Sequence, residues 1–402
     1  MKVEIVKLDD FGRGICFVNN KVTFVPNTIP GDIVNIKIVK ENKKYNEAIL
    51  IDLVKSSSKR IDAPCPYFGI CGGCTLQTLS YEKGIDYKKE KVINYFKKMG
   101  LIINPSLITN DTPYNYRNKA QYPVGLDKSG APIMGVFAER SHEIVSMQKC
   151  FIQNVEAEKI AFAIYKFIKE QHIPVYNEKT MEGLIRHIVI KVGIRTHEVM
   201  CILVVNGKKI PHEQELVEML VKEYDVKTVV KNINMKNTNV ILGYDNVVLH
   251  GDGYIYDILG DYTFKISPMS FYQVNPTQAE ALYNIAIEET NLSKDDILFD
   301  LYCGIGTIGI FASKYVNKVY GIEIVPQAIE DAKENAKING ISNASFYDGD
   351  CKDVVLNLKN SGMKFDTVVV DPPRKGCSTE VINLIEEISP KKVVYVSCNS
   401  AT

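Results

Sequence analysis

The chain has 402 residues, of which 46% are hydrophobic and 24% charged, and its formal net charge is zero. This length exceeds one ordinary hydrophobic core and predicts two or three domains of a globular protein. The neutral balance argues by itself against a simple polyanion-binding domain, and no apolar run approaches the roughly 20 residues of a membrane span. Residues 1–10 lack the apolar core of a signal peptide, so we expect a cytoplasmic protein.

Charge is unevenly distributed along the sequence. Residues 1–100 carry 17 Lys and Arg against 11 Asp and Glu, whereas residues 286–402 carry 12 against 17. A basic beginning suits nucleic acid and an acidic end suits a small cofactor, although ordinary solvated charge would give the same counts. In a reducing compartment the ten cysteines favour metal binding or catalysis over disulfide bonds.

Short alternating segments dominate residues 1–55, with turn residues between them. This pattern predicts a small five-stranded β-barrel. Its lysines at 37, 40, 43 and 44 suit an RNA-binding rim, and a purely structural barrel is the alternative. The stretches GRG at 12–14, PGD at 30–32 and SSSKRIDAPC at 56–65 resemble the TRAM domain that precedes certain RNA-modifying enzymes.

Three cysteines follow the barrel, at positions 65, 71 and 74 in CPYFGICGGC. The glycines among them allow a tight fold in which three thiolates converge. Zn²⁺ and [4Fe–4S] clusters both take four ligands, and we choose Cys150 as the fourth. A single triplet with a distant fourth cysteine favours an iron–sulfur cluster, and zinc stays open at this point.

Residues 80–100 have helical periodicity, with Ser80 as the expected N-cap and Gly100 as the stop. The next distinctive segment, YNYRNKAQYP at 114–123, places Arg117 and Lys119 among tyrosines. Basic side chains between aromatic ones suit RNA contact, and they are equally common on plain strands.

Helices and strands then alternate up to residue 265. LIRHIVIK is the clearest strand, and Arg186 and His187 within it are expected on the sheet surface, outside catalysis. The expected helices are 155–171 and 212–223, and the expected strands are 185–193, 198–205, 227–232 and 239–242.

A boundary lies at residues 267–289, where an extended SFYQVN precedes a helix capped by Asn275 with Pro276 at its first position. Beyond it, apolar strands alternate with helices, the βαβ pattern of a doubly wound parallel sheet. Five strands are expected: 296–301, 319–324, 344–348, 366–371 and 392–398.

A glycine loop, CGIGTIG at 303–309, follows the first of these strands. Its amide groups at a helix N-terminus suit a dinucleotide or S-adenosylmethionine (SAM). Glu323 ends the second strand, where acidic residues bind ribose hydroxyls, and Asp348 and Asp350 end the third, where they suit an adenine amino group. Asp371 begins DPPR after the fourth strand, and a helix cap is its structural alternative.

The last strand leads into Cys398. A cysteine at the carboxyl end of a parallel strand faces the crevice where open α/β sheets bind ligands, so we predict that Cys398 is a nucleophile. Methyltransferases that act on exocyclic amines carry an aromatic after the proline pair, whereas this chain has Arg374. This difference favours a carbon acceptor.

Together, CPYFGICGGC, SFYQVN, DLYCGIGTIGIF, VVVDPPRKG and VSCN are similar to the motifs of the RNA uracil-5-methyltransferase family, in particular its iron–sulfur-bearing 23S ribosomal RNA branch. The resemblance covers nearly the whole chain. It implies a Rossmann-like SAM methyltransferase domain at 266–402, a TRAM/OB-like barrel at 1–60 and a central α+β domain at 61–265.

The resemblance also implies specific ligands, with a [4Fe–4S] cluster on the four cysteines named above. The expected SAM contacts, including those at the glycine loop and the strand ends, are Gln273, Tyr302, Gly304, Glu323, Asp350 and Asp371. Carbon 5 of uracil is too weakly nucleophilic to accept a methyl group unaided. Attack of the Cys398 thiolate on carbon 6 would activate it, with cationic neighbours such as Arg374 favouring the thiolate, and the uridine must be flipped or single-stranded.

Two departures from the family pattern stand out. Position 400 is Ser where the family has Pro, which should leave Cys398 in place. Related enzymes continue beyond this motif and supply a glutamate as general base, so we expect slow adduct formation and slower product release from these 402 residues. We expect a monomer acting on 23S ribosomal RNA; the alternatives are a transfer RNA uracil-5-methyltransferase and an iron–sulfur RNA-binding protein with a vestigial methylase domain.

Overall fold

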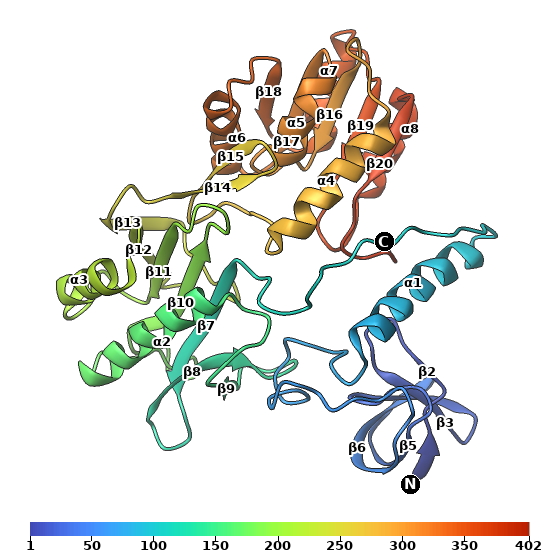
Figure 1. Ribbon diagram of the computed structural model, residues 1–402, viewed down its shortest axis with the longest axis vertical. Coiled ribbons are helices and arrows are strands. Elements are labelled where there is room, and N and C mark those ends of the chain that lie inside the picture. The colour runs from blue at the N-terminus through green and yellow to red at the C-terminus, as the bar shows by residue number, and fades with distance from the viewer. Residues whose placement is uncertain (402) are drawn as a thin grey trace. The chain divides into compact units, whose positions relative to one another are not determined.

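The computed structural model describes residues 1–401, and its chain forms two compact units (Figure 1). Unit 1 consists of residues 1–107 and 127–151, and unit 2 of residues 108–126 and the chain from 152 onward. The three-domain division drawn from the sequence groups residues 61–265 differently, and it stays a prediction. No helix among residues 1–401 is both long and apolar enough to cross a bilayer.

Six short strands of unit 1 form a barrel-like sheet in the order β1-β5-β6-β4-β3-β2. Ile5 and Val6 form a short link between β1 and β2, the two edge strands of this sheet. The backbone N–H of Ile5 donates to the carbonyl of Asp32, and that of Val6 donates to the carbonyl of Ile15. Alternate residues such as Val25 and Val34 fill the interior. Six strands are present where five were expected, because the first expected strand is interrupted at this link. The strands are β1 (Lys2–Glu4), β2 (Lys7–Leu8), β3 (Gly14–Val18), β4 (Lys21–Val25), β5 (Ile33–Glu41) and β6 (Tyr45–Lys55).

Unit 1 continues with helix α1 (Tyr81–Lys98) and the antiparallel strands β8 (Pro132–Phe137) and β9 (Ile144–Ser146). The side chain of Ser80 accepts a hydrogen bond from the Lys83 N–H, which is the predicted N-cap. Gly100 follows with a φ of +79°, a conformation that ends helices and favours glycine. The predicted helix and both of its boundaries are confirmed.

Unit 2 begins with a sheet in the order β13-β12-β11-β10-β7, flanked by α2 and α3. β11 and β12 are parallel and the other pairs antiparallel. The strand expected at 239–242 is wrong, because these residues lie in a loop that precedes β13. The elements are β7 (Lys119–Leu126), α2 (Val155–Glu170), β10 (Ile185–Val192), β11 (Val199–Val205), α3 (Glu213–Tyr224), β12 (Thr228–Ile233) and β13 (Asp245–His250).

The hairpin β14 (Ile255–Leu259) and β15 (Tyr262–Ile266) leads into a five-stranded parallel sheet in the order β18-β17-β16-β19-β20. All five predicted strands are present. They are β16 (Ile297–Leu301), β17 (Lys318–Glu323), β18 (Ala344–Asp348), β19 (Thr367–Val370) and β20 (Lys392–Tyr395).

Helices cover both faces of the parallel sheet, so it is doubly wound (Figure 1). Alternate strand residues divide between the faces: Leu298 packs with α4, α5 and α6, whereas Phe299 packs with α7 and α8. The first face shares its hydrophobic core with β10–β12 and with the hairpin. The helices are α4 (Pro276–Thr290), α5 (Thr307–Ala312), α6 (Pro326–Ile338), α7 (Cys351–Asn360) and α8 (Thr379–Ile388), with a 3₁₀ turn at Ser313–Tyr315.

Candidate active site at the carboxyl edge of the parallel sheet

The predicted site residues of the parallel sheet lie at the carboxyl ends of its strands. In-register pairing of Leu301 with Ile322 and Val370, and of Val370 with Tyr395, aligns these ends at one edge. The residues at or just past these strand ends are Tyr302, Glu323, Asp348, Asp371 and Val396–Cys398. This is the crevice edge at which open α/β sheets bind ligands.

The glycine loop is held against Glu323. Gly304 and Gly306 have φ values of +54° and +81°, which non-glycine residues rarely adopt. The Gly304 N–H donates to a Glu323 carboxylate oxygen at 3.3 Å. A Cβ on Gly306 would lie 2.8 Å from the ring of Phe346, so the loop also needs glycine for close packing.

A fully buried carboxyl group, Asp300, and a half-buried one, Asp371, lie near this loop. Asp300 on β16 is fully buried, and one of its oxygens accepts the Gly309 N–H at 2.8 Å. Burial raises the pKa of Asp300 to about 7, and the nearby charges of Asp371 and Glu323 act in the same direction. Burial also raises the pKa of Asp371 to about 6. The site therefore contains two carboxyl groups whose protonation changes near neutral pH.

Tyr302 has a φ of +64°, an unfavourable value for an aromatic residue. Burial raises the pKa of its hydroxyl, and Cys351, Cys377 and Asp350 are its electrostatic neighbours. Strain of this kind persists only where the surroundings enforce it, and it concentrates at functional sites. The position of Tyr302 directly before the glycine loop agrees with such a role.

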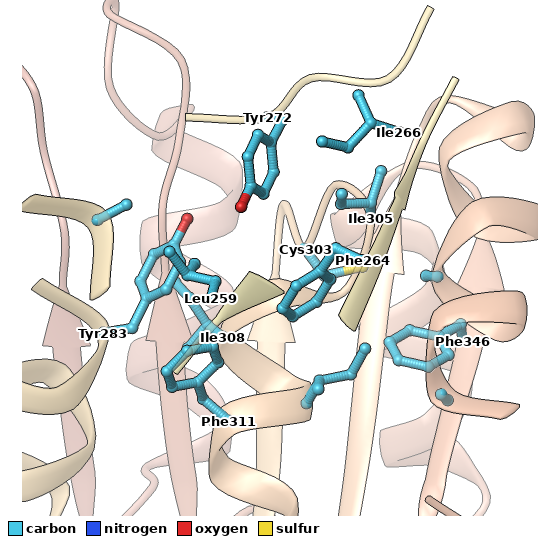
Figure 2. Close-up of a cluster of buried hydrophobic side chains, with 14 of the residues drawn as sticks. Leu259, Phe264, Ile266, Tyr272, Tyr283, Cys303, Ile305, Ile308, Phe311 and Phe346 are labelled. Carbon is cyan, nitrogen blue, oxygen red and sulfur yellow. The ribbon is translucent and has the colours of Figure 1, made fainter. Parts of the chain in front are cut away.

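Gln273 belongs to a polar group next to the loop. Its carbonyl accepts the Asn118 side-chain N–H at 3.0 Å, and its side chain hydrogen bonds with the hydroxyl of Tyr283. The Tyr283 hydroxyl also accepts a bond from the Thr307 hydroxyl at 3.3 Å. In Figure 2 Tyr283 directs its hydroxyl toward Tyr272, beside Cys303 and Ile308 of the loop region. These contacts link the segment that carries Gln273 to the N-terminus of α5.

A buried lysine fixes the start of the same segment. Lys191 on β10 donates three hydrogen bonds, to the carbonyls of Ser267 at 2.8 Å, Pro268 at 3.0 Å and Ser270 at 3.0 Å. Burial lowers the pKa of Lys191. Three acceptors nevertheless require three N–H groups, so this geometry is that of a charged ammonium group.

Helix α6 carries the connection onward to the glycine loop. The Asp331 carboxylate accepts bonds from the hydroxyls of Ser267 at 2.8 Å and Ser270 at 2.6 Å. One turn later, fully buried Asn335 accepts the Lys265 N–H at 2.7 Å and donates to the Ile305 carbonyl at 3.2 Å. Lys191 and the glycine loop are thus joined through one face of α6.

Cys398 lies exposed in a turn just past β20. The strand expected to run to 398 ends at Tyr395, although the Val396 N–H still pairs with the Val370 carbonyl at 2.8 Å. The Ser397 hydroxyl accepts the Asn399 N–H at 3.0 Å and closes the turn. Within residues 1–401, Cys398 and Arg374 share no hydrogen bond or ion pair, and the expected influence of Arg374 on the thiolate stays a prediction.

Asp350 and Asp371 differ in their local roles. Asp350 is the N-cap of α7, where it accepts the Lys352 N–H at 2.9 Å. Asp371 is not a helix cap, because α8 begins at Thr379 with Ser378 as its cap. The carboxyl group of Asp371 therefore has no structural task of that kind, which favours the functional interpretation.

Comparison with known proteins agrees with this arrangement. The profile of the tRNA (uracil-5-)-methyltransferase family matches residues 202–402, and that of the TRAM domain matches residues 1–51. The chain belongs to the tRNA (uracil-5-)-methyltransferase family. It is an RNA methyltransferase with a Rossmann-like methyltransferase domain, a TRAM barrel and a central α+β domain.

Three individual proteins illustrate the similarity. An uncharacterised RNA methyltransferase of Clostridium acetobutylicum is 43% identical, over 99% of this chain and 88% of its own length. Another, of Halalkalibacterium halodurans, is 42% identical over 100% and 88%. The crystal structure of Pyrococcus abyssi tRNA (uracil-54, C5)-methyltransferase, in complex with S-adenosyl-L-homocysteine, is 27% identical with a TM-score of 0.78, covering 100% of this chain and 91% of its own.

The four predicted cluster ligands of this family member all lie in unit 1 as half-buried cysteines that form no disulfide bond. The Gly73 N–H donates to the Cys71 sulfur at 3.3 Å, and the charge of Cys65 acts on Cys71. The chemistry of these donors fits an iron–sulfur cluster. Within residues 1–401, however, no three His, Cys, Asp or Glu side chains are gathered as metal ligands.

Several residues of the site were not predicted from the sequence of this methyltransferase. Asp300 could have been found, because a carboxylate inside an apolar strand must have a buried partner. In the sequence pattern, Tyr283 is one more apolar position of α4, and Lys191 is an ordinary strand residue. Their polar partners lie far away in the sequence, so local patterns carry no signal for them.

Proposed function

We propose that this family member uses SAM to methylate carbon 5 of a uridine in RNA, with Cys398 as the nucleophile. The observation that carries the proposal is the exposed Cys398 thiol on the same sheet edge as the glycine loop and the acidic strand ends. An amine or ribose methylase needs no thiol at this position.

The chemistry follows from the properties of uracil. The Cys398 thiolate adds to carbon 6, the ring electrons move toward the carbon 4 carbonyl, and carbon 5 becomes nucleophilic. Bound SAM supplies an electrophilic methyl group for carbon 5. Loss of the carbon 5 proton then re-forms the carbon 5–carbon 6 double bond, and the thiolate leaves. Because Cys398 lies in an exposed turn, it can reach a uridine that has been flipped out of its stack.

The proposed SAM contacts follow the sheet edge. Glu323 would bind ribose hydroxyls, and the backbone N–H groups after Gly304 would face the amino-acid part of the cofactor. Asp350 keeps one carboxylate oxygen beyond its capping bond for the adenine amino group. Tyr302 would contact the cofactor from the start of the loop.

Gln273 and Asp371 would lie nearest the transferred methyl group. Tyr283 supports this assignment, because it bonds to Gln273 and lies within electrostatic range of Asp371. A partly charged Asp371 would favour a positively charged sulfonium in this pocket. Both positions were expected from the family resemblance.

We further propose a [4Fe–4S] cluster on Cys65, Cys71, Cys74 and Cys150. Their location in one compact unit, without disulfide bonds, supports this assignment. The basic amino-terminal region, including the TRAM barrel, would bind RNA phosphates. The four-cysteine motif favours 23S ribosomal RNA in a cytoplasmic, monomeric enzyme. Transfer RNA is the second candidate substrate, because the matching family profile and the Pyrococcus abyssi structure are those of transfer RNA enzymes.

Replacement of Cys398 by Ser tests the mechanism. Transcripts of 23S ribosomal RNA and transfer RNA are incubated with SAM carrying a labelled methyl group, and 5-methyluridine is mapped in each. We expect C398S to lose methyl transfer by at least about 10³-fold, because a serine hydroxyl is a far weaker nucleophile at neutral pH. Binding of S-adenosylhomocysteine should stay unchanged, since Cys398 is not among the proposed cofactor contacts.

A covalent complex gives an independent readout. RNA that contains 5-fluorouridine keeps fluorine on carbon 5, so the final elimination is blocked and the wild-type protein should stay bound through Cys398. C398S should form no such complex. Full methylation by C398S would overturn the carbon 5 mechanism and favour an amine or ribose acceptor.

A further inference from the structure

The loop between β12 and β13 exposes several apolar side chains to solvent. Met235, Val240 and Tyr244 have relative exposures of 60%, 64% and 86%. The Lys236 ammonium group lies over the Tyr244 ring at 5.7 Å from its centroid. Exposed apolar side chains gathered on one loop indicate a binding surface when the loop conformation is itself fixed.

Buried asparagines hold this loop from inside. Asn234 donates to the carbonyls of Val240 at 2.7 Å and Ile241 at 3.0 Å. Fully buried Asn232 donates to the Gly243 carbonyl at 2.8 Å and accepts the Gly243 N–H at 2.7 Å. Both ends of the loop are therefore tied to the end of β12.

A buried arginine completes the support. Arg186 on β10 donates to the carbonyls of Asn234 at 2.7 Å and Lys236 at 2.9 Å, and its guanidinium lies 4.5 Å from the centre of the Tyr176 ring. Arg186 was expected on the sheet surface, whereas it is 5% exposed. Three buried polar side chains thus fix the loop that displays Tyr244. Because the loop is already ordered, binding at Tyr244 loses little conformational entropy.

Neighbouring loops extend the surface at the same end of the sheet. Val205 pairs with Ile233, so the loop with Lys208 and Lys209 begins beside that of Tyr244. Asn206 bonds to the carbonyls of Met181 and Gly183, which brings in the preceding turn. We call this end of the sheet the β11–β12 tip.

We propose that the β11–β12 tip binds single-stranded RNA by stacking a base on Tyr244, at a site separate from the sheet edge that carries Cys398. This inference rests on the proposed RNA substrate. The ring, backed by Lys236 on one face, offers the other face to a base, and exposed Asn237 and Asn239 provide hydrogen-bonding groups for base edges.

The charges of the tip favour single strands over duplexes. Its four lysines are offset by Glu178, Glu182 and Asp245, so phosphate attraction alone is weak; the lysines are Lys179, Lys208, Lys209 and Lys236. Duplex RNA is recognised mainly through phosphates and shape, whereas unpaired bases bind by stacking on aromatic rings. The tip and Lys191 lie at opposite ends of β10. At about 3.3 Å per residue, the strand separates them by roughly 20 Å. It would therefore hold RNA that flanks the target uridine.

Fluorescence anisotropy with a 12-nucleotide oligouridine and with a blunt RNA duplex tests this inference in the full chain. We expect Y244A to weaken oligouridine binding at least about fivefold, and Y244F to keep wild-type affinity because its ring still stacks. Duplex binding and S-adenosylhomocysteine binding should stay unchanged in both variants. Y315A is the matched control, since Tyr315 is also exposed and lies 5.2 Å from the Lys314 ammonium group.

Wild-type oligouridine affinity in Y244A would overturn the inference, and so would equal losses in Y244F and Y244A. A loss with Y315A as large as with Y244A would show that any exposed tyrosine contributes, and would also overturn it. Binding needs no methyl transfer, so the C398S experiment can fail while this inference stands. If Y244A bound oligouridine normally while methylation still depended on Cys398, the inference about the tip would be wrong and the proposed function would stand.

Discussion

At the scale of single residues, Asp300 makes the stability of the methyltransferase sheet depend on pH. Its native pKa of about 7 lies above the ordinary value of 3.8, because burial disfavours the charged form. Between these values the native state keeps a proton that the unfolded chain has released. The contribution of Asp300 to the free energy of unfolding is therefore largest at acidic pH and falls by up to about 4 kcal/mol as the pH rises toward 7.

D300N removes this titration and keeps an oxygen that can accept the Gly309 N–H. Urea unfolding at about pH 5, 6 and 7.5 should show a flatter pH dependence for D300N than for the wild type in both intervals, and the interval above pH 6 distinguishes Asp300 from Asp371. D371N is the matched control, because the raised pKa of Asp371 acts only up to about pH 6. Parallel profiles for D300N and the wild type would contradict the assignment.

Residue types and spacing predicted the edge positions but not the groups that support them. The places of Cys398, Glu323 and Asp371 were predictable because each lies at or shortly after the end of an apolar strand, and parallel strands end at one edge. Asp300 and Tyr283 lie inside elements whose periodicity only reports burial. The expected effect of Arg374 on Cys398 stays a prediction, because proximity between two exposed side chains depends on turn geometry that short motifs do not fix.

At the scale of elements, Lys191 and α6 connect the central sheet to the glycine loop. K191M would leave three carbonyl groups without their ammonium partner and should cost about 2–4 kcal/mol of stability. The segment that leads to Gln273 would shift, so we expect S-adenosylhomocysteine affinity to fall about tenfold. Isothermal titration calorimetry measures this loss directly.

K231M separates loss of position from loss of stability. Lys231 is equally buried, but its ammonium group pairs with Glu213 on α3 at 2.6 Å instead of with the carbonyls of the 267–274 segment. We expect K231M to lower the melting temperature and to leave S-adenosylhomocysteine affinity unchanged. If K231M weakened the cofactor analogue as much as K191M, the effect would be general destabilisation and the positioning role of Lys191 would be wrong.

Elements were predicted well wherever periodicity and capping agreed. Helix α1 and the five parallel strands follow directly from the sequence pattern, since local propensity and burial point the same way. The strand expected at 239–242 is absent because the Asn234 side chain, instead of a neighbouring strand, bonds to the carbonyls of Val240 and Ile241, and Ile241 and Leu242 pack on the core from a loop. Apolar runs indicate a strand only when their backbone groups pair with a neighbour.

At the scale of the whole molecule, unit 1 is assembled from two separated segments of the chain. Residues 1–107 carry Cys65, Cys71 and Cys74, whereas Cys150 belongs to the second segment, 127–151. The Gln148 N–H donates to the Tyr67 hydroxyl at 3.0 Å and brings the second segment to the first. A cluster shared by all four cysteines would add a covalent link between the two segments and close a long loop.

C150S is therefore expected to lower the stability of unit 1 and to leave cofactor binding in unit 2 unchanged. Anaerobically purified wild-type protein should contain about four irons per chain with visible charge-transfer absorption, and C150S markedly less. Limited proteolysis should cut C150S faster within residues 1–151, while S-adenosylhomocysteine affinity stays at the wild-type value. C201S is the control, because Cys201 is buried in β11 of unit 2 and should leave the iron content unaffected. Zinc in place of iron would change the identity of the metal and keep the link between the segments. If the wild-type protein contained no metal and C150S resisted protease equally well, packing alone would join the two segments.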